Sequence, residues 1–278
     1  MIDSHLTTAL LQFYDYPDPK HPTRMIEGYD KPHALRTAWM CTTVAQDLGY
    51  QSETLQSFHI ACLLHDLGRA GLDHAIFSQI WSWAKNQNIP TRPGEWRARF
   101  PATPYGKETE AFVARYQVEL EKQGISIDPW TIQQIEMRLG FARRLKRQLR
   151  RVKPALAQIG VQWAPWMGKI MLYYYYPETF ARSPRWIRQL GEILVACEQL
   201  EAYSNRQRGK DYYTRSQEQF EDAFAFLEAL THNNILTRIV VNSVKKLTAT
   251  GTFDHILQSA RGKKLSKREI TFLRSLNT

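Results

Sequence analysis

The sequence has little of what several large classes of protein require. Only three of its 278 residues are cysteines, Cys41, Cys62 and Cys197. They are odd in number, far apart and set in apolar sequence, so we expect buried thiols in a reducing compartment and no disulfide framework. No stretch approaches the roughly 18 to 20 apolar residues of a membrane span, and the N-terminus lacks a signal peptide's basic and apolar regions. We therefore expect a cytoplasmic protein without a transmembrane helix.

Strand patterns and internal repeats are also scarce. The best strand candidate, residues 239–241, fits a helix as well, because almost every periodic segment repeats its apolar residues at three and four positions. The sequence therefore predicts an all-α fold. The expected helices cover residues 4–15, 33–48, 53–66, 73–87, 106–123, 130–152, 154–160, 166–176, 184–205, 216–230, 233–247, 252–260 and 266–276.

Prolines and capping residues mark the boundaries of these helices. Four prolines in residues 16–32 and four in residues 88–105 predict loops there. Asp128, placed before a proline, and Ser266, three residues before Glu269, are typical of helix starts.

The length and composition describe an ordinary folded protein with a strong positive charge. A hydrophobic fraction of 43% excludes wholesale disorder, and the length allows one or two domains. We expect a helical domain over residues 1–232 and a helical C-terminal extension over 233–278 packed on it. The formal charge of +10 favours anionic partners such as phosphate esters, nucleic acid or acidic proteins.

Three residues point to a metal site. His65 and Asp66 are adjacent, so on a helix they point about 100° apart and need further ligands from another helix. His33 begins the preceding helix, and a short turn at residues 49–52 would bring an antiparallel pair of helices together, so that residue 33 lies beside residue 65. Imidazole nitrogen with carboxylate oxygen suits zinc, manganese, iron or, less well, magnesium, which leaves the metal open.

The same residues carry a family resemblance. HDLGRA at 65–70 is similar to the HD-[ILV]-G-[KR] run of the HD superfamily of metal-dependent phosphohydrolases, and HALRT at 33–37 to its His-x-x-Arg opening. The resemblance implies an HD-domain helical bundle, a divalent metal ion (manganese, iron, zinc, nickel or magnesium) and hydrolysis of a phosphate ester such as a nucleotide or cyclic (di)nucleotide. The alternative is that the His–Asp pair merely caps a helix.

The family's distant Asp ligand has no direct counterpart. The segment ILVACEQLEAYSNRQRG at 193–209 resembles a helix of HD-GYP proteins, with Glu198 in place of the metal-binding Asp and Glu201 in place of a second Asp. The resemblance implies Glu198 as the fourth ligand, although its extra methylene requires the helix or the metal to move. Alternatively, both glutamates pair with Arg206 or Arg208.

Other HD-GYP hallmarks are replaced. TPYGKETEAF at 103–112 and LYYYYPETF at 172–180 have tyrosines where that family has histidines, so we expect one metal ion. His59, Asp73 and His74 are further ligand candidates, or ordinary hydrogen-bonded residues.

The expected catalytic residues are Asp66, Arg69 and Arg36. A bound metal acidifies water and polarises a phosphoryl oxygen, and guanidinium groups of Arg69 and Arg36 match phosphate oxygens bidentately. Lys31 could add a contact. The alternative for both arginines is a surface salt bridge.

Residues 138–153 combine eight positive side chains with no acid and an apolar stripe. The pattern predicts an amphipathic helix whose arginines face outward and bind an anionic macromolecule: nucleic acid, an acidic protein or a membrane surface. The alternative is a solvated face. The arginines expected there are Arg143, Arg144, Arg147, Arg150 and Arg151.

Two classes of function follow. The first is the metal-dependent phosphohydrolase. The second is a catalytically degenerate binding or regulatory module for a nucleotide or an acidic partner. Oxygenase chemistry at iron, found in some HD-like proteins, is a third option.

Overall fold

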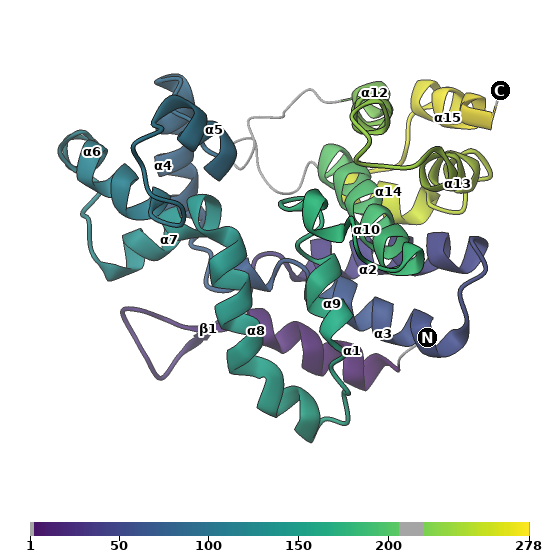
Figure 1. Ribbon diagram of the computed structural model, residues 1–278, viewed down its shortest axis with the longest axis horizontal. Coiled ribbons are helices and arrows are strands. Elements are labelled where there is room, and N and C mark those ends of the chain that lie inside the picture. Colours follow the sequence, from purple (N-terminus) through teal and green to yellow (C-terminus); the bar gives the residue numbers. More distant parts are fainter. Residues whose placement is uncertain (1–2, 206–218, 278) are drawn as a thin grey trace.

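The computed structural model describes residues 3–205 and 219–277, which form an all-α fold (Figure 1), as predicted. The described part has one short two-stranded ladder, which the sequence did not predict. Residues 239–241, the best strand candidate, lie in a helix. The elements are α1 (Ser4–Leu11), β1 (Tyr16–Pro17), β2 (Met25–Ile26), α2 (Lys31–Asp47), α3 (Ser52–Leu63), α4 (His74–Asn86), α5 (Pro93–Arg99), α6 (Glu108–Lys122), α7 (Pro129–Leu139), α8 (Phe141–Gln158), α9 (Pro165–Ile170), α10 (Arg185–Ser204), α12 (Phe220–His232), α13 (Arg238–Ala249), α14 (Asp254–Arg261) and α15 (Lys267–Arg274).

Several of the predicted boundaries are wrong, and the helix expected over 154–160 is part of α8, which continues through Pro154. The loop expected over residues 88–105 contains α5, which begins at Pro93 because a proline in the first turn needs no backbone donor. The helix expected over 130–152 is divided at Gly140, where α7 ends and α8 begins. Glycine has a weak helix propensity, so a break at this position costs little.

The helices gather around two hydrophobic cores. The larger core is built by α1 to α3, α8 to α10 and α12 to α15. The smaller core lies under α4 to α7 and contains Trp81, Trp96 and Phe112. In Figure 1, α4 to α7 form one lobe and α12 to α15 lie on the opposite side of the molecule.

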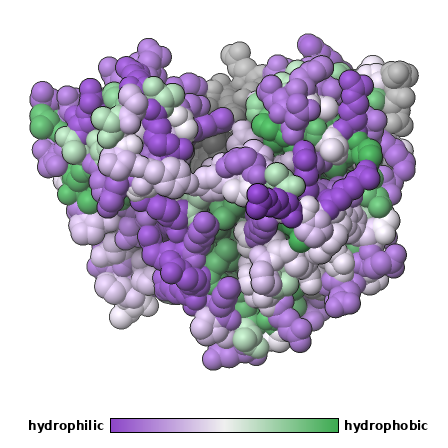
Figure 2. Space-filling view, viewed as in Figure 1, coloured by the Kyte–Doolittle hydropathy of each residue, from purple (hydrophilic) through white to green (hydrophobic). Residues whose placement is uncertain are grey.

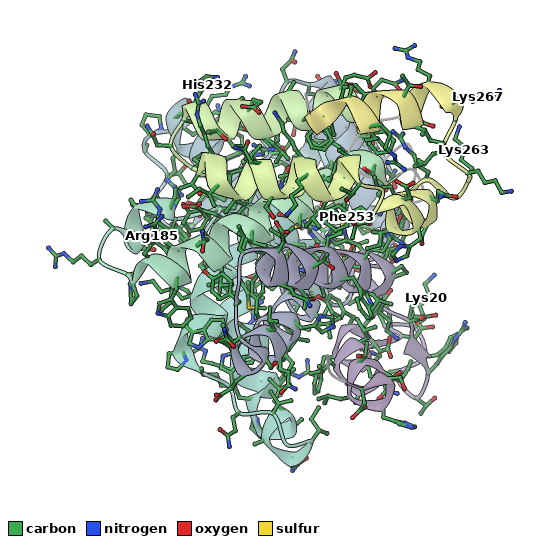
Figure 3. The ribbon with its side chains drawn as sticks, turned by 90° about the vertical axis from the view of Figure 1, so that its right-hand side faces the viewer. Lys20, Arg185, His232, Phe253, Lys263 and Lys267 are labelled. Carbon is green, nitrogen blue, oxygen red and sulfur yellow. The ribbon has the colours of Figure 1, made fainter. Side chains whose placement is uncertain are left out.

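The C-terminal helices share the larger core with the rest of the chain. Phe253 is fully buried, while Lys263 and Lys267 point into solvent at the edge of this region (Figure 3). Val240 and Val244 of α13 belong to the same core cluster as residues of α2 and α10, on which α13 packs. The segment 233–278 is therefore joined to residues 1–232 by continuous apolar packing.

None of the helices in the described ranges combines the length and the apolar character needed to cross a bilayer.

Candidate metal centre

A helical hairpin brings the predicted ligands together. α2 and α3 pack against each other, and the turn between them uses Gly49 at φ +83°, a conformation that favours glycine. His33 lies in the first turn of α2. α3 ends at Leu63, so His65 and Asp66 lie in the turn beyond it, opposite the start of α2.

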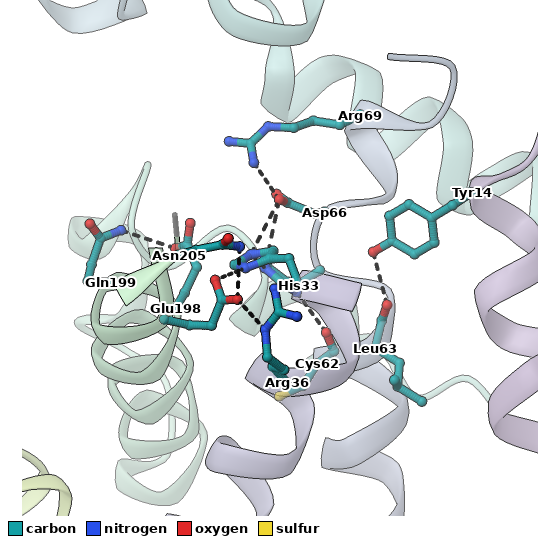
Figure 4. Close-up of polar contacts among 12 residues, drawn as sticks. Tyr14, His33, Arg36, Cys62, Leu63, Asp66, Arg69, Glu198, Gln199 and Asn205 are labelled. Atoms are coloured by element: carbon teal, nitrogen blue, oxygen red, sulfur yellow. Dashed lines mark hydrogen bonds and ion pairs between the residues drawn. The ribbon is translucent and has the colours of Figure 1, made fainter. Parts of the chain in front are cut away.

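The three predicted ligands form one buried cluster (Figure 4). Potential ligand atoms of His33, His65 and Asp66 all lie within 4.8 Å of one another. The Nε2 atoms of His33 and His65 are 3.2 Å apart. Asp66 Oδ2 lies 3.7 Å from His33 Nε2 and 4.0 Å from His65 Nε2. This cluster could hold a metal ion.

Hydrogen bonds behind the two imidazole rings orient them toward that position. His33 Nδ1 contacts the Glu201 carboxylate, and His65 Nδ1 lies 2.7 Å from the carbonyl oxygen of Cys62. Each Nδ1 therefore carries a proton, and when both rings are neutral the lone pairs of the two Nε2 atoms face each other. Facing lone pairs repel unless a cation or proton lies between them. Two nitrogens bound to one tetrahedral zinc ion at about 2.0–2.1 Å lie about 3.3 Å apart, so the observed spacing fits a metal.

Two buried ion pairs lie at the cluster. Asp66 contacts Arg69, and Arg36 Nε donates to Glu201 Oε1 at 2.7 Å. Each carboxylate is therefore balanced by a guanidinium group in the absence of other ligands. The phosphate contact expected of Arg36 stays a prediction, and the structure gives this guanidinium a partner inside the protein.

His65 is neutral at neutral pH. Burial lowers its pKa below 6.5, and the neighbouring His33 acts in the same direction, whereas Asp66 and Glu198 only partly offset the burial. A neutral imidazole is the form that binds a metal, so no proton has to be removed first.

Glu198, the predicted fourth ligand, faces the cluster across a small cavity. A space of about 20 Å³ is lined by Glu198 together with His65 and Asp66. A space of roughly 10–15 Å³ is enough to admit one water molecule. The described cluster of close ligand atoms does not include Glu198. The alternative partners of the glutamates, Arg206 and Arg208, lie outside the described residues.

The role of Glu201 could not be recognised in the sequence. It is fully buried and supports His33 from behind, with a further hydrogen bond from Asn205 Nδ2 at 3.1 Å. The available signal was its spacing, because residues 198 and 201 are three apart and therefore share a face of α10.

The remaining ligand candidates have structural partners. His59 is buried, its Nδ1 lies 2.8 Å from the Thr42 hydroxyl, and burial lowers its pKa to about 4. Asp73 caps α4 through the backbone amides of residues 75 and 76. His74 packs its ring on Tyr29. Lys31 forms an ion pair with Asp15 at 2.6 Å.

Arg144 corrects the prediction for the basic helix. It does not face outward, because its side chain is only 2% exposed and binds the loop that follows Asp66. Its Nε donates to the carbonyl oxygen of Gly68 and its Nη2 to that of Ala70, both at 2.8 Å. The loop lies so close to α8 that a Cβ atom at Gly68 would be 2.7 Å from the ring of Phe141.

The other arginines of α8 are divided among three environments. Arg147 is exposed and forms a bidentate ion pair with Glu136, with N···O distances of 2.9 and 2.5 Å. Arg150 and Arg151 are exposed. Arg143 lines a cleft of about 420 Å³ that shares lining residues with the small cavity at His65 and Asp66.

The tyrosine run forms one wall of that cleft. A helix was predicted over residues 166–176, but α9 ends at Ile170 and the tyrosines follow in a turn. Tyr173 is buried and donates to the carbonyl oxygen of Ile235 at 2.7 Å. Tyr174, Tyr175 and Tyr176 line the cleft.

Comparison with known proteins adds no relative to this picture. The chain matches no protein-family model, no curated protein and no solved structure.

Proposed function

We propose that this chain is a metal-dependent phosphohydrolase of the HD type, acting on a phosphate ester. One observation carries the proposal: the two buried Nε2 atoms of His33 and His65 face each other at 3.2 Å while both Nδ1 atoms are engaged elsewhere. Such a pair needs a cation or a proton between its members, and a metal ion held by both imidazoles and by Asp66 would meet this need. Asp66 supplies the oxygen donor, and Glu198 would complete the set from α10.

This donor set suits a transition-metal ion. Two imidazole nitrogens with carboxylate oxygens favour zinc, manganese, iron or nickel over magnesium, which prefers an all-oxygen environment. A divalent ion bound here would supply Lewis acidity toward a phosphoryl oxygen and would acidify water. The protein's own contribution is to hold His33 in register through Glu201, whose other oxygen is bound by Arg36.

Arg69 lies within reach of both Asp66 and the adjacent cleft. It contacts Asp66 Oδ2, the same oxygen that faces both imidazoles. A metal at the cluster competes with Arg69 for this oxygen, because both are cations. Once displaced, the guanidinium can turn into the adjacent cleft, which it already lines, and bind a substrate phosphate bidentately.

The metal content of the purified protein tests the proposal. We expect about one equivalent of a divalent transition metal by elemental mass spectrometry, in protein purified without chelators or nickel affinity resin. His65→Gln and Asp66→Asn should lose that metal together with metal-dependent hydrolysis of p-nitrophenyl phosphate or bis-p-nitrophenyl phosphate.

His59→Gln is the matched control, since His59 is buried like His65 but belongs to α3 and lies outside the cluster. It should retain the metal. A wild-type protein that stays empty after incubation with zinc, manganese and iron would refute the proposal, as would undiminished hydrolysis by the metal-free variants.

The binding-module alternative gives a different result in the same experiment. It predicts an empty cluster and no hydrolysis, with nucleotide binding in the cleft retained. The tyrosines that replace the family's later histidines favour this alternative, whereas the orientation of His33 and His65 favours the enzyme.

A further inference from the structure

A large cleft opens directly from the metal centre. Its volume is about 420 Å³, and it is lined by residues 91–97 at the start of α5, residues 105, 106 and 108, the junction of α7 and α8, the tyrosine turn and α10. Phe141, Tyr174, Tyr175 and Glu198 line both this cleft and the small cavity at His65 and Asp66. A substrate whose phosphate reaches the metal centre would therefore extend into the cleft.

The walls of the cleft carry an excess of positive charge. Among the described residues, five arginines and three glutamates line it. Arg69 is paired with Asp66 and Arg97 with the buried Glu108. The arginines of the lining are Arg69, Arg92, Arg97, Arg138 and Arg143.

Arg143 is the cation of this wall that lacks a close partner. No hydrogen bond or ion pair joins it to another residue in the described ranges, and its charge acts on Glu110 only from beyond ion-pair distance. The guanidinium lies between two glycines: a Cβ atom would be 3.1 Å from it at Gly140 and 3.4 Å at Gly106. A half-buried, unpaired guanidinium beside a cleft is an anion-binding group, because a ligand anion would replace the water that it has lost.

Aromatic rings also line the cleft. Phe141 and Tyr175 stack with ring centres 5.1 Å apart, and Tyr105 donates a hydrogen bond to Tyr176 at 2.8 Å. Such a wall offers flat apolar surface to a ring and hydroxyl groups to polar atoms. The cleft is also of the size that holds small organic ligands, at about 300–1,000 Å³, which is more than one phosphate group needs.

We infer that the cleft is a leaving-group site that selects phosphate esters carrying a second anionic group, with Arg143 as the specificity-determining residue. The assignment of the cleft to the leaving group rests on the proposed hydrolase function. The binding preference itself does not depend on the metal, since Arg143 belongs to the cleft and not to the ligand cluster.

Two probes that differ by one phosphate test this inference. Adenosine 3′,5′-bisphosphate and adenosine 5′-monophosphate share a ring and one phosphate, so their difference in affinity isolates the second anion. In calorimetry on metal-free protein, we expect the bisphosphate to bind at least about ten-fold more tightly, as one charge-assisted pair implies. Arg143→Ala should abolish this preference, and Arg143→Lys should retain part of it.

Arg24→Ala is the control, since Arg24 is an exposed arginine of the β1–β2 loop, outside the cleft. It should keep the wild-type preference. Equal affinities of the wild-type protein for the two probes, or an intact preference in a folded Arg143→Ala protein, would overturn the inference.

The metal-loaded enzyme separates this inference from the proposed function. Hydrolysis of p-nitrophenyl phosphate without a preference between the two adenosine probes would leave the hydrolase standing and remove the leaving-group site. A preference that Arg143→Ala abolishes, in a protein without hydrolytic activity, would support the anion site and refute the hydrolase function.

Discussion

At the scale of single residues, two histidines close in the sequence, His59 and His65, show how the environment of a side chain determines whether it can bind a metal. His59 and His65 are both buried and near the end of the same helix. His59 faces a threonine hydroxyl and the edge of Trp39, whereas His65 faces another imidazole and a carboxylate. Only the second environment combines ligand atoms around one point, so the same side chain is packing in one case and a candidate ligand in the other.

His59 makes the stability depend on pH. Burial lowers its pKa from 6.5 to about 4, so below 6.5 the unfolded chain takes up a proton that the folded chain refuses. The free energy of unfolding is therefore unaffected by this proton above pH 6.5. It decreases by about 2–3 kcal/mol as the pH falls toward 4.

Urea denaturation at pH 7.5 and 4.5 measures this effect. We expect the wild-type protein to lose about 2–3 kcal/mol more than His59→Gln over this interval. The carboxylates contribute equally to both proteins, so identical losses would contradict the assignment.

At the scale of elements, the loop that follows α3 depends on two helices distant in sequence. Arg144 of α8 holds the carbonyl oxygens of residues 68 and 70, and Gln134 of α7 binds the carbonyl of Gly71 and the amide of Asp73. These contacts hold the loop that carries Asp66 at the cluster and Arg69 at the cleft, so α7 and α8 are the positioning elements of the candidate site.

Replacement of Arg144 should therefore affect both stability and metal binding. Arg144→Gln leaves buried carbonyls without donors, which should lower the free energy of unfolding by about 2–4 kcal/mol in urea titrations. We also expect weaker zinc binding in calorimetry, because the Asp66 loop loses its support. Arg151→Gln, an exposed neighbour on the same helix, should change stability by less than about 0.5 kcal/mol.

At the scale of the whole molecule, only part of the positive charge predicted for the basic helix is exposed to solvent. Hydrophilic side chains cover the front of the region around α8 in Figure 2. The exposed basic residues of α8 include Lys146, Arg150, Arg151 and Lys153. This face is the part of the predicted basic surface that the fold leaves open to an anionic macromolecule. Nucleic acid binding to such a face depends on salt, because each neutralised phosphate releases a counterion.

Charge reversal tests this surface against the net charge of the chain. Each Arg→Glu or Lys→Glu change lowers the charge by two, so Arg150→Glu/Arg151→Glu and Lys263→Glu/Lys264→Glu both carry +6 in place of +10. In fluorescence anisotropy with a 20-base-pair DNA duplex, we expect the first variant alone to bind at least about ten-fold more weakly and to show a smaller salt slope. Equal weakening in both variants would mean that net charge, and not this face, attracts the duplex.

The sequence by itself determined the helical character, most helix boundaries and the clustering of His33, His65 and Asp66. The reason is that these features are local: apolar spacing defines a helix, Asp128 and Ser266 cap helices as predicted, and a short turn forces α2 and α3 to lie side by side. His33 and the pair at 65–66 are close in sequence, so hairpin geometry alone brings them together.

The tertiary structure decided what the long-range contacts do. Glu201 lies 168 residues from His33 and Arg144 lies 76 residues from Gly68, and neither pairing leaves a trace in local spacing. An amphipathic pattern shows that a helix has two faces, but an arginine at the edge of the apolar stripe can turn either way. Arg144 turns inward because unpaired carbonyls lie beneath it, and such partners exist only once the chain has folded.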